Sequence, residues 1–316
     1  MHNKGNLACL MSSVFLSVIV CTKNRADELE CCLPLVIEQA NAFSDVELVV
    51  VDNGSVDNTK NTVKRISKEH NFRILYAYEP VAGLCQARNR GRKEAHGKVL
   101  AYIDDDVRIK DRWVQNIRKH FLERRSDCLG GKVTVRLGGE VPIKGAQQML
   151  WFFGETDLGI ESREYMGTDR IQYPAGCNMA FKADVFDAVG GFDTSLKYYF
   201  DETEFFRRVG RYDFKVLYVH DVEVEQFIPV ARLTKDELRR KTNLLGNGAA
   251  IFWNLSNPGV VPWAKRFGIC TLKSVYHLLS YIINPTFGKF FAFWFNYGWI
   301  RQLLKFRFAK YRDRLE

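Results

Sequence analysis

Lys98-Val-Leu-Ala-Tyr-Ile-Asp-Asp-Asp-Val-Arg108 is the stretch of sequence that decides the fold. The run from Val99 to Ile103 is rich in β-branched and aromatic residues and has no polar alternation, a pattern typical of a strand buried on both faces of a parallel sheet. Asp104, Asp105 and Asp106 follow at its carboxyl end. Ligands of open α/β sheets bind at that end, and carboxylate oxygens suit Mg²⁺ or Mn²⁺. The same residues also fit a solvated turn that caps the next helix.

Composition places the chain among globular proteins. Of the 316 residues, 47% are apolar and 13% aromatic, which is enough for a packed core and excludes a disordered or fibrous chain. The formal net charge is +9, and the tail from Ala264 to Glu316 holds ten Lys or Arg and two acids, so the basicity belongs to that tail. The eight cysteines form no CxxC pair, which is typical of unpaired thiols in a reducing compartment.

The first residues have the order of a signal peptide, a positive charge followed by an apolar run, because Lys4 precedes such a run. That run continues straight into Cys21-Thr-Lys-Asn-Arg25 without a small-residue cleavage site. We therefore expect a short arm at residues 1–13 and a first strand after it.

Strand-like and helix-like segments alternate through the first half of the chain. A helix is expected over Gly83–His96, with Gly97 taking the left-handed conformation at its end. Such alternation predicts βαβ units and a mainly parallel sheet. The expected strands are Phe15–Cys21, Val46–Val51, Arg73–Tyr78 and Val99–Ile103.

The residues that follow the first two strands bear on the class of ligand that the protein binds. The first strand opens into Thr22-Lys-Asn-Arg-Ala-Asp27, which lacks the GxGxxG of dinucleotide-dependent dehydrogenases and weakens that class. Asp52 ends the second strand, where its carboxylate either accepts hydrogen bonds from a ribose or base or holds the Asn53-Gly54 turn.

The periodicity weakens after residue 130, and long glycine-containing loops follow. Asp201 and Glu204 are three residues apart at a helix start, which fits a capping arrangement. That arrangement gives no role to Glu202. A strand is expected over Lys215–Val219, ending at His220.

Six motifs follow one another along the chain: Ser17–Arg25, Val49–Asp57, Gly83–Gly91, Asp104–Asp106, Gly176–Ala180 with Gly190–Asp193, and Asp201–Arg208. Taken together, they resemble family 2 glycosyltransferases of the GT-A fold, over roughly Phe15 to Gly246. The resemblance implies an α/β protein with a Rossmann-like, mainly parallel central sheet flanked by helices, here with a helical, basic and aromatic carboxyl-terminal extension. It also implies a division into residues 14–135 for the nucleotide-sugar half, 136–246 for the acceptor half and 247–316 for the tail.

The same resemblance implies transfer, with inversion, from a nucleotide-diphosphate sugar linked to UDP, GDP or dTDP. Arg88 and Asn89 are expected near the nucleotide and its phosphates, and Asp104 and Asp105 beside the nucleotide. Mg²⁺ or Mn²⁺ is expected on Asp106, together with Asp104 and the late histidine His220, for which a half-buried structural role is equally open. The residues expected around the nucleoside are Thr22, Asn24, Arg25 and Asp52.

The acceptor side follows from the same family pattern. An inverting reaction needs a base for the acceptor hydroxyl, and the family's acid pair matches Asp201-Glu202, so Glu202 is the expected base and Asp201 the alternative. Gly176 and Asn178 are expected to face the acceptor, a glycan or lipid-linked molecule in surface polysaccharide or glycolipid synthesis.

The tail predicts a peripheral membrane contact on the cytoplasmic face. Its apolar stretches are interrupted by Lys273 and Lys289, so none has the length of a confident spanning helix, although a spanning hairpin stays open. Aromatic residues mixed with cations suit the headgroup region of an anionic membrane, with Trp294, Tyr297 and Trp299 at the interface. The alternative is a hairpin packed on the rest of the protein. No nucleic-acid recognition module accompanies the tail, so nucleic acid is not an expected partner.

Two other functions are weaker. A non-catalytic protein that binds a nucleotide sugar or a partner enzyme has no need of both acidic clusters. A nucleotidyltransferase normally has a glycine-rich basic loop after the first strand, which Thr22 to Asp27 does not supply.

Overall fold

The computed structural model of the chain describes residues 14–123, 126–165, 173–196, 199–256 and 260–312, so the expected arm lies outside the described residues. Contacts within the chain separate two compact units. The sheet unit comprises Met1–Thr134, Thr156–Gly191 and Phe206–Glu225. The helical unit comprises Val135–Glu155, Phe192–Phe205 and Gln226–Glu316.

The four expected strands of the first half are present and run parallel. They pair in the order β3-β2-β1-β4. Thr22 lies opposite Asp52 and Cys21 lies opposite Asp104, so three strands end at one edge, which we call the carboxyl edge. The strands are β1 (Leu16–Thr22), β2 (Val46–Asp52), β3 (Ile74–Tyr78) and β4 (Val99–Asp104).

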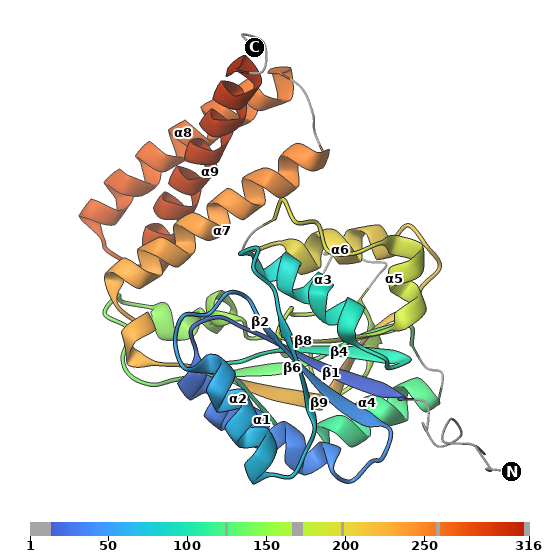
Figure 1. The fold of residues 1–316 in the computed structure, drawn as a ribbon. Helices are drawn as coiled ribbons and strands as arrows, with labels where there is room; N and C mark the ends of the chain where they lie inside the picture. The colour runs from blue at the N-terminus through green and yellow to red at the C-terminus, as the bar shows by residue number, and fades with distance from the viewer. Residues whose placement is uncertain (1–13, 124–125, 166–172, 197–198, 257–259, 313–316) are drawn as a thin grey trace, which may run out of the picture. The chain divides into compact units, whose positions relative to one another are not determined.

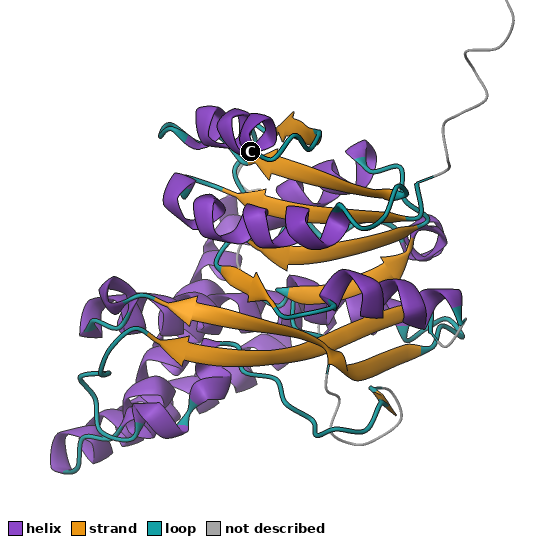
Figure 2. Ribbon diagram, turned by 90° about the horizontal axis from the view of Figure 1, so that it is seen from below, coloured by secondary structure: helices purple, strands orange, loops and turns teal. Residues whose placement is uncertain are grey.

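The rest of the sheet is mixed. β8 is antiparallel to β4, and β6 is antiparallel to β8. The described strands follow the order β3-β2-β1-β4-β8-β6-β9-β5, with β7 paired to β9, and Figure 2 shows them side by side with helices crossing in front. These strands are β5 (Val107–Ile109), β6 (Cys128–Leu137), β7 (Arg163–Glu164), β8 (Asn178–Lys182) and β9 (Val216–Ile228).

Helices cover both faces of the sheet unit (Figure 1). One face carries α1 (Ala26–Ala40), α2 (Thr59–Glu69) and α4 (Trp113–Leu122), and the other carries α3 (Leu84–Glu94) and α5 (Ala183–Val189). The expected α/β architecture, a mainly parallel sheet flanked by helices, is confirmed.

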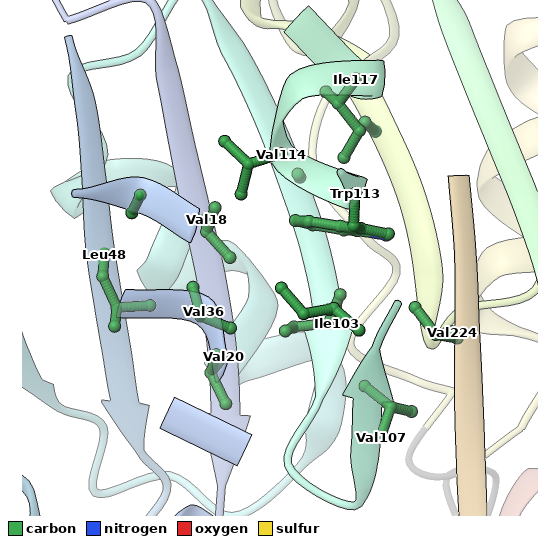
Figure 3. Close-up of a cluster of buried hydrophobic side chains, with 14 of the residues drawn as sticks. Val18, Val20, Val36, Leu48, Ile103, Val107, Trp113, Val114, Ile117 and Val224 are labelled. Atoms are coloured by element: carbon green, nitrogen blue, oxygen red, sulfur yellow. The ribbon is translucent and has the colours of Figure 1, made fainter. Parts of the chain in front are cut away.

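β1 shows why these strands are apolar on both sides. Val18 and Val20 belong to the buried cluster with α1 and α4, in which Trp113 is fully buried (Figure 3). Their neighbour Ile19 faces α3, where a Cβ on Gly91 would lie 2.5 Å from its side chain. Because successive side chains of a strand point to opposite faces, a strand covered on both sides has no polar alternation.

Gly97 differs from its sequence prediction. It does not adopt the left-handed conformation; α3 ends at Glu94, and the next residue, Ala95, is extended. A Cβ on Gly97 would lie 2.5 Å from the backbone nitrogen of Ser17, and the Gly97 N–H donates to the Ser17 hydroxyl at 2.8 Å. The glycine is therefore required for the close approach of this turn to β1.

The helical unit is built from α7 (Lys235–Ser256), α8 (Val260–Ile283) and α9 (Phe287–Arg312). α9 packs against both α7 and α8. A Cβ on Gly246 would lie 2.1 Å from the Phe295 carbonyl oxygen, and one on Gly298 would lie 2.3 Å from that of Asn243, so the two glycines bring α7 and α9 together. The sequence-based limit at residue 246 falls inside α7, which is continuous there. Three short 3₁₀ segments are η1 (Ala146–Gln148), η2 (Leu150–Phe153) and η3 (Val230–Arg232).

Among the α9 aromatic side chains that the structure describes, Phe287, Phe290 and Trp299 are buried, contrary to the expectation of an interfacial belt. Trp299 is 3% exposed and packs with Ala250 and Leu303, while the partly buried Trp294 packs on Phe290. Tyr297 is exposed. The prediction was wrong for Trp299 because apolar faces of α7 and α8 cover that side of α9. Within the described residues, none of the helices combines the length and apolar character needed to cross a membrane.

Candidate functional site at the carboxyl edge

The loops after β1 and β2 are joined by hydrogen bonds. Asn24 has a φ of 53°, a left-handed conformation that Asn tolerates better than most residues. Its side-chain oxygen accepts from the Val56 N–H at 2.8 Å, and its own N–H donates to the Ser55 hydroxyl at 2.8 Å. Asp57 accepts from the Ala26 N–H, at the start of α1, at 3.2 Å. The side chain of Asn24 thus braces the two loops that the sequence assigned to the nucleoside.

Asp52 is buried at the end of β2, where it was expected. One carboxylate oxygen accepts from the Tyr76 hydroxyl at 2.6 Å, and the other accepts from the Ser55 N–H at 2.8 Å. Burial, with the bond to Asp52, raises the pKa of Tyr76, so this hydroxyl remains a donor. Each carboxylate oxygen has two lone pairs, and the two internal bonds therefore leave Asp52 further acceptor capacity.

The side chain of Asp105 forms internal contacts at the carboxyl edge, whereas the sequence predicted it beside the nucleotide. It is 2% exposed, and its oxygens accept from the Thr22 hydroxyl at 2.7 Å and from Nη1 of Arg25 at 2.5 Å. Burial raises the pKa of Asp105 to about 7, against the lowering effect of Arg25. Asp105 and Thr22 were expected beside the nucleotide, but their side chains turn into the protein and tie the end of β1 to that of β4.

Arg25 links the two buried carboxylates. Its Nη1 also lies 3.4 Å from Oδ2 of Asp106, which is buried like Asp105. Burial works against the charge of Arg25, but Asp105, Asp106 and Asp104 outweigh that effect and hold its pKa above the usual value. One guanidinium thereby offsets the repulsion between adjacent carboxylates.

A second arginine lies beside the first aspartate of the run. Nη2 of the buried Arg88 is 3.6 Å from Oδ1 of Asp104 and donates to the Gly176 carbonyl at 2.9 Å. The Asp104 side chain is 32% exposed, the most open of the three aspartates. A Cβ on Gly176 would lie 2.7 Å from Nη2 of Arg88, so this position accepts only glycine without moving the arginine. Gly176, expected at the acceptor, therefore contacts a residue expected at the donor.

Asn89 follows Arg88 on α3 and lies against the Gly190-Gly191 turn. A Cβ on Gly191 would be 2.6 Å from Oδ1 of Asn89. Arg208 holds this turn through the carbonyls of Val189 at 2.6 Å and Gly191 at 2.7 Å. Three of the sequence motifs thus meet in space, although they are separate in the chain.

The side chain of Asn178, which was expected to face the acceptor, is buried inside the sheet unit. It is 1% exposed, and its side-chain oxygen accepts from Nε1 of Trp113 at 3.0 Å. Its amide nitrogen donates to the carbonyls of Lys132 at 3.0 Å and Val222 at 2.7 Å. Asn178 therefore joins β8, α4, β6 and β9 inside the sheet unit.

His220 was expected at the end of a strand, but it lies within one. β9 continues to Ile228, and His220 is exposed part-way along it. Across the part of the chain that the structure describes, no three His, Cys, Asp or Glu side chains are grouped so as to hold a metal ion. Asp104, Asp106 and His220 consequently do not form the expected trio, and Asp104 and Asp106 remain the candidates for an ion.

The two expected acids of the acceptor side are the first residues of α6 (Asp201–Val209), and both acids belong to the helical unit. Asp201 is buried and Glu202 is half-buried. Phe200, directly before them, has a φ of 69°, and its carbonyl accepts the Glu204 N–H at 2.8 Å. This left-handed residue sets the direction in which the helix starts.

Sequence reasoning missed Ser55, Asp57 and Tyr76. Asp57 precedes a helix start and accepts from both the N–H and the hydroxyl of Thr59, a local pattern that the letters alone could have suggested. Tyr76 gave no such signal, because its bond to Asp52 depends on the pairing of β2 with β3.

Residues 17–190, more than half of the chain, match the model of glycosyl transferase family 2. The chain belongs to this family. It is 31% identical over 119 residues to glycosyltransferase AglE of Haloferax volcanii, a match that covers 38% of this chain and 39% of that protein. It is 28% identical over 187 residues to the glucosyl-dolichyl phosphate glucuronosyltransferase of the same organism, covering 57% and 56%. The matches thus span well under two thirds of these relatives.

Solved structures share the fold. The mannosyltransferase PcManGT from Pyrobaculum calidifontis, in complex with GDP-Man and Mn²⁺, has a TM-score of 0.58 at 18% identity and covers 78% of this chain and 64% of its own. S. aureus TarS 1-349 has a TM-score of 0.54 at 16% identity and covers 92% and 89%. The expected GT-A fold is confirmed.

Proposed function

We propose that this family 2 member is an enzyme that transfers a sugar, with inversion, from a nucleotide-diphosphate sugar to a glycan or lipid-linked acceptor. The observation that carries the proposal is the charged constellation at the carboxyl edge: Asp52, Asp104 and Asp106 gather where three parallel strands end, with Arg25 and Arg88 beside them. Open α/β sheets bind nucleotides at this edge.

The chain's own residues divide the work on the donor. Asp52, held in place by Tyr76 and Ser55, accepts hydrogen bonds from the base. Arg88 lies next to Asn89 and supplies a fixed positive charge for the diphosphate. Its contacts with Gly176 and Asp104 orient the guanidinium before the donor arrives.

The two remaining aspartates fit a divalent cation. Mg²⁺ is usually bound by one or two carboxylates together with substrate phosphates rather than by a full set of protein ligands, so a site with fewer than three grouped protein ligands suits it. Asp104 and Asp106 would hold Mg²⁺ or Mn²⁺. When bound, such an ion stabilises the negative charge that develops on the departing diphosphate. The Mn²⁺ in the PcManGT complex supports this assignment.

Proton removal from the acceptor is assigned to Glu202, with Asp201 as its alternative. A base at this step must reach the attacking hydroxyl, and Glu202 has the longer side chain and the greater exposure of the two. Asp201 is buried at the helix start, where the N-terminal end of the helix dipole favours a carboxylate. We assign Asp201 to holding the start of α6.

The acceptor class is supported by one relative. The glucosyl-dolichyl phosphate glucuronosyltransferase of Haloferax volcanii has a lipid-linked saccharide in its name. A lipid-linked or glycan acceptor in surface polysaccharide or glycolipid synthesis, used at the cytoplasmic face of a membrane, is consistent with that likeness. The donor nucleotide is UDP, GDP or dTDP.

The test is turnover, measured as release of nucleoside diphosphate with a panel of sugar donors and with glycan or lipid-linked acceptors. Glu202→Gln is expected to lower kcat by about 100-fold to 10,000-fold and to leave donor binding unchanged. Glu204→Gln, in the same turn of α6, is the matched control. Full turnover in Glu202→Gln together with its loss in Asp201→Asn would reassign the base. Donor binding without turnover by the unaltered chain would favour the non-catalytic alternative.

A further inference from the structure

One helix of the tail presents an apolar surface that the described residues do not cover. We call it the α8 face. Its side chains are 38% to 84% exposed, and they are all aliphatic apart from one tyrosine. The α8 face consists of Leu272, Val275, Tyr276, Leu278, Leu279, Ile282 and Ile283.

The α8 face is one side of a helix whose other side is packed. Cys270 and Ser274 are buried, and Cys270 belongs to the apolar cluster of Trp299 on α9. At about 100° per residue, Leu272, Leu279 and Ile283 project from α8 within about 40° of one another. α8 therefore has two apolar sides, of which one is covered by α9 and the other is exposed.

Exposure of this extent is unusual for a protein that works alone in water. Single exposed apolar residues need no explanation, but contiguous exposed apolar patches mark contact surfaces. The α8 face is contiguous, since its members lie at helical spacing over the last three turns of α8.

The charge of the tail indicates which kind of partner complements the α8 face. Between residues 260 and 312 the sequence has nine Lys or Arg and no Asp or Glu. Lys273 is exposed beside Leu272, and Lys265, also exposed, lies two turns earlier on the same side of α8. A partner that combines an apolar interior with negative charge at its surface complements both features.

We propose that the α8 face docks on the surface of an anionic lipid bilayer, with α8 lying in the headgroup region and its aliphatic side chains reaching the acyl boundary. Interfacial helices of this kind combine an apolar side with flanking Lys and Arg. A second copy of the chain is a poor occupant, because it brings another cationic segment without acids. The proposal does not depend on the catalytic one, since docking requires no donor sugar.

The experiment is co-sedimentation of the full chain with vesicles, without any nucleotide sugar. The vesicles are phosphatidylcholine alone or phosphatidylcholine with phosphatidylglycerol. We expect binding to the anionic vesicles, weakened by added salt because part of it is electrostatic. Ile283→Glu is expected to weaken that binding about tenfold, since it removes one buried aliphatic side chain and adds a repelled charge.

Matched variants separate docking from general effects. Ile160→Glu places the same change at a residue of the sheet unit that is 81% exposed, against 84% for Ile283, and is expected to bind as the unaltered chain does. Lys273→Gln is expected to weaken binding to anionic vesicles, whereas Lys68→Gln on α2 is not. Circular dichroism confirms that each variant is folded.

Two results would overturn the proposal. The first is equal vesicle binding by Ile283→Glu and Ile160→Glu, or no binding by any chain. The second is a dimer, seen by light scattering without lipid, that Ile283→Glu converts to a monomer while vesicle binding is unchanged, because the occupant is then a second copy. Turnover on a water-soluble acceptor is expected to survive in Ile283→Glu, so failure of docking is distinguishable from failure of catalysis.

Discussion

Nη1 of Arg25 donates to the buried carboxylate of Asp105 at 2.5 Å. This bond joins the loop after β1 to the end of β4, and the same nitrogen is 3.4 Å from Asp106. Asp105 therefore has an internal role at the carboxyl edge, and in the proposed function Asp104 and Asp106 are the carboxylates assigned to the ion.

Replacing Arg25 tests this organisation. Arg25→Gln leaves two adjacent buried carboxylates without their guanidinium, and we expect it to lower the free energy of unfolding by about 1–3 kcal/mol, less than for a fully buried pair because the arginine is partly exposed. Urea denaturation at pH 7 measures this change. Arg65→Gln, which removes the surface ion pairs with Glu30 and Glu69, is the control and is expected to have a much smaller effect. Equal losses in the two variants would contradict the account.

Acid should weaken the bond network between the loops at Asp57. Burial works against its charge, but bonds from Thr59 and Ala26 outweigh that effect and hold the pKa of Asp57 below its usual value. A lowered native pKa means that the stability gained from this carboxylate is complete above the unfolded-state pKa, about 3.9, and is lost as the pH falls through the native value. At pH 6 we therefore expect Asp57→Asn to have a lower free energy of unfolding than the unaltered chain. The difference shrinks below about pH 4. Asp111→Asn, at an exposed position, is the comparison, and a difference that grows in acid would refute the assignment.

Gly176→Ala is expected to weaken donor binding without unfolding the protein. The added Cβ meets the end of the Arg88 side chain at 2.7 Å, so the guanidinium must leave its place beside Asp104. Calorimetry with the nucleotide and thermal denaturation report the two effects separately. Gly268→Ala is the control, because nothing lies within 4 Å of a Cβ there. Unchanged nucleotide affinity in Gly176→Ala would remove Arg88 from the donor site.

Asn178→Ala is expected to act on stability and not on acceptor recognition. It leaves the Trp113 N–H and two carbonyls without their partner, at a cost of about 2–4 kcal/mol. Urea denaturation checks the loss, with the exposed Asn284→Ala as the control. A folded, equally stable Asn178→Ala with a raised KM for acceptor would restore the acceptor role that the sequence suggested.

The sequence predicts the sheet well because the relevant signal is local. Val99 to Ile103 has no polar alternation, and the structure buries this strand on both faces. The position of Asp104 follows from the same run. The orientation of Asp105 does not, since it depends on Thr22 and Arg25, some 80 residues earlier in the chain.

The other differences between the expectations and the structure share that cause. Asn178 is satisfied by Trp113, Lys132 and Val222, three partners from distant segments. His220 was assigned to a strand end, but pairing with other strands carries β9 on to Ile228. The surroundings of these two residues are decided by tertiary contacts, which cannot be predicted from a single sequence.

The most direct test of the central claim is calorimetric titration of the full chain with UDP, GDP and dTDP, with and without Mn²⁺, repeated on Asp106→Asn. The account predicts that one nucleotide binds, that Mn²⁺ strengthens its binding, and that Asp106→Asn abolishes the effect of Mn²⁺ while the fold is retained. Absence of binding by all three nucleotides, or binding that is indifferent to both Mn²⁺ and Asp106, would contradict the assignment of the carboxyl edge as a nucleotide-sugar site.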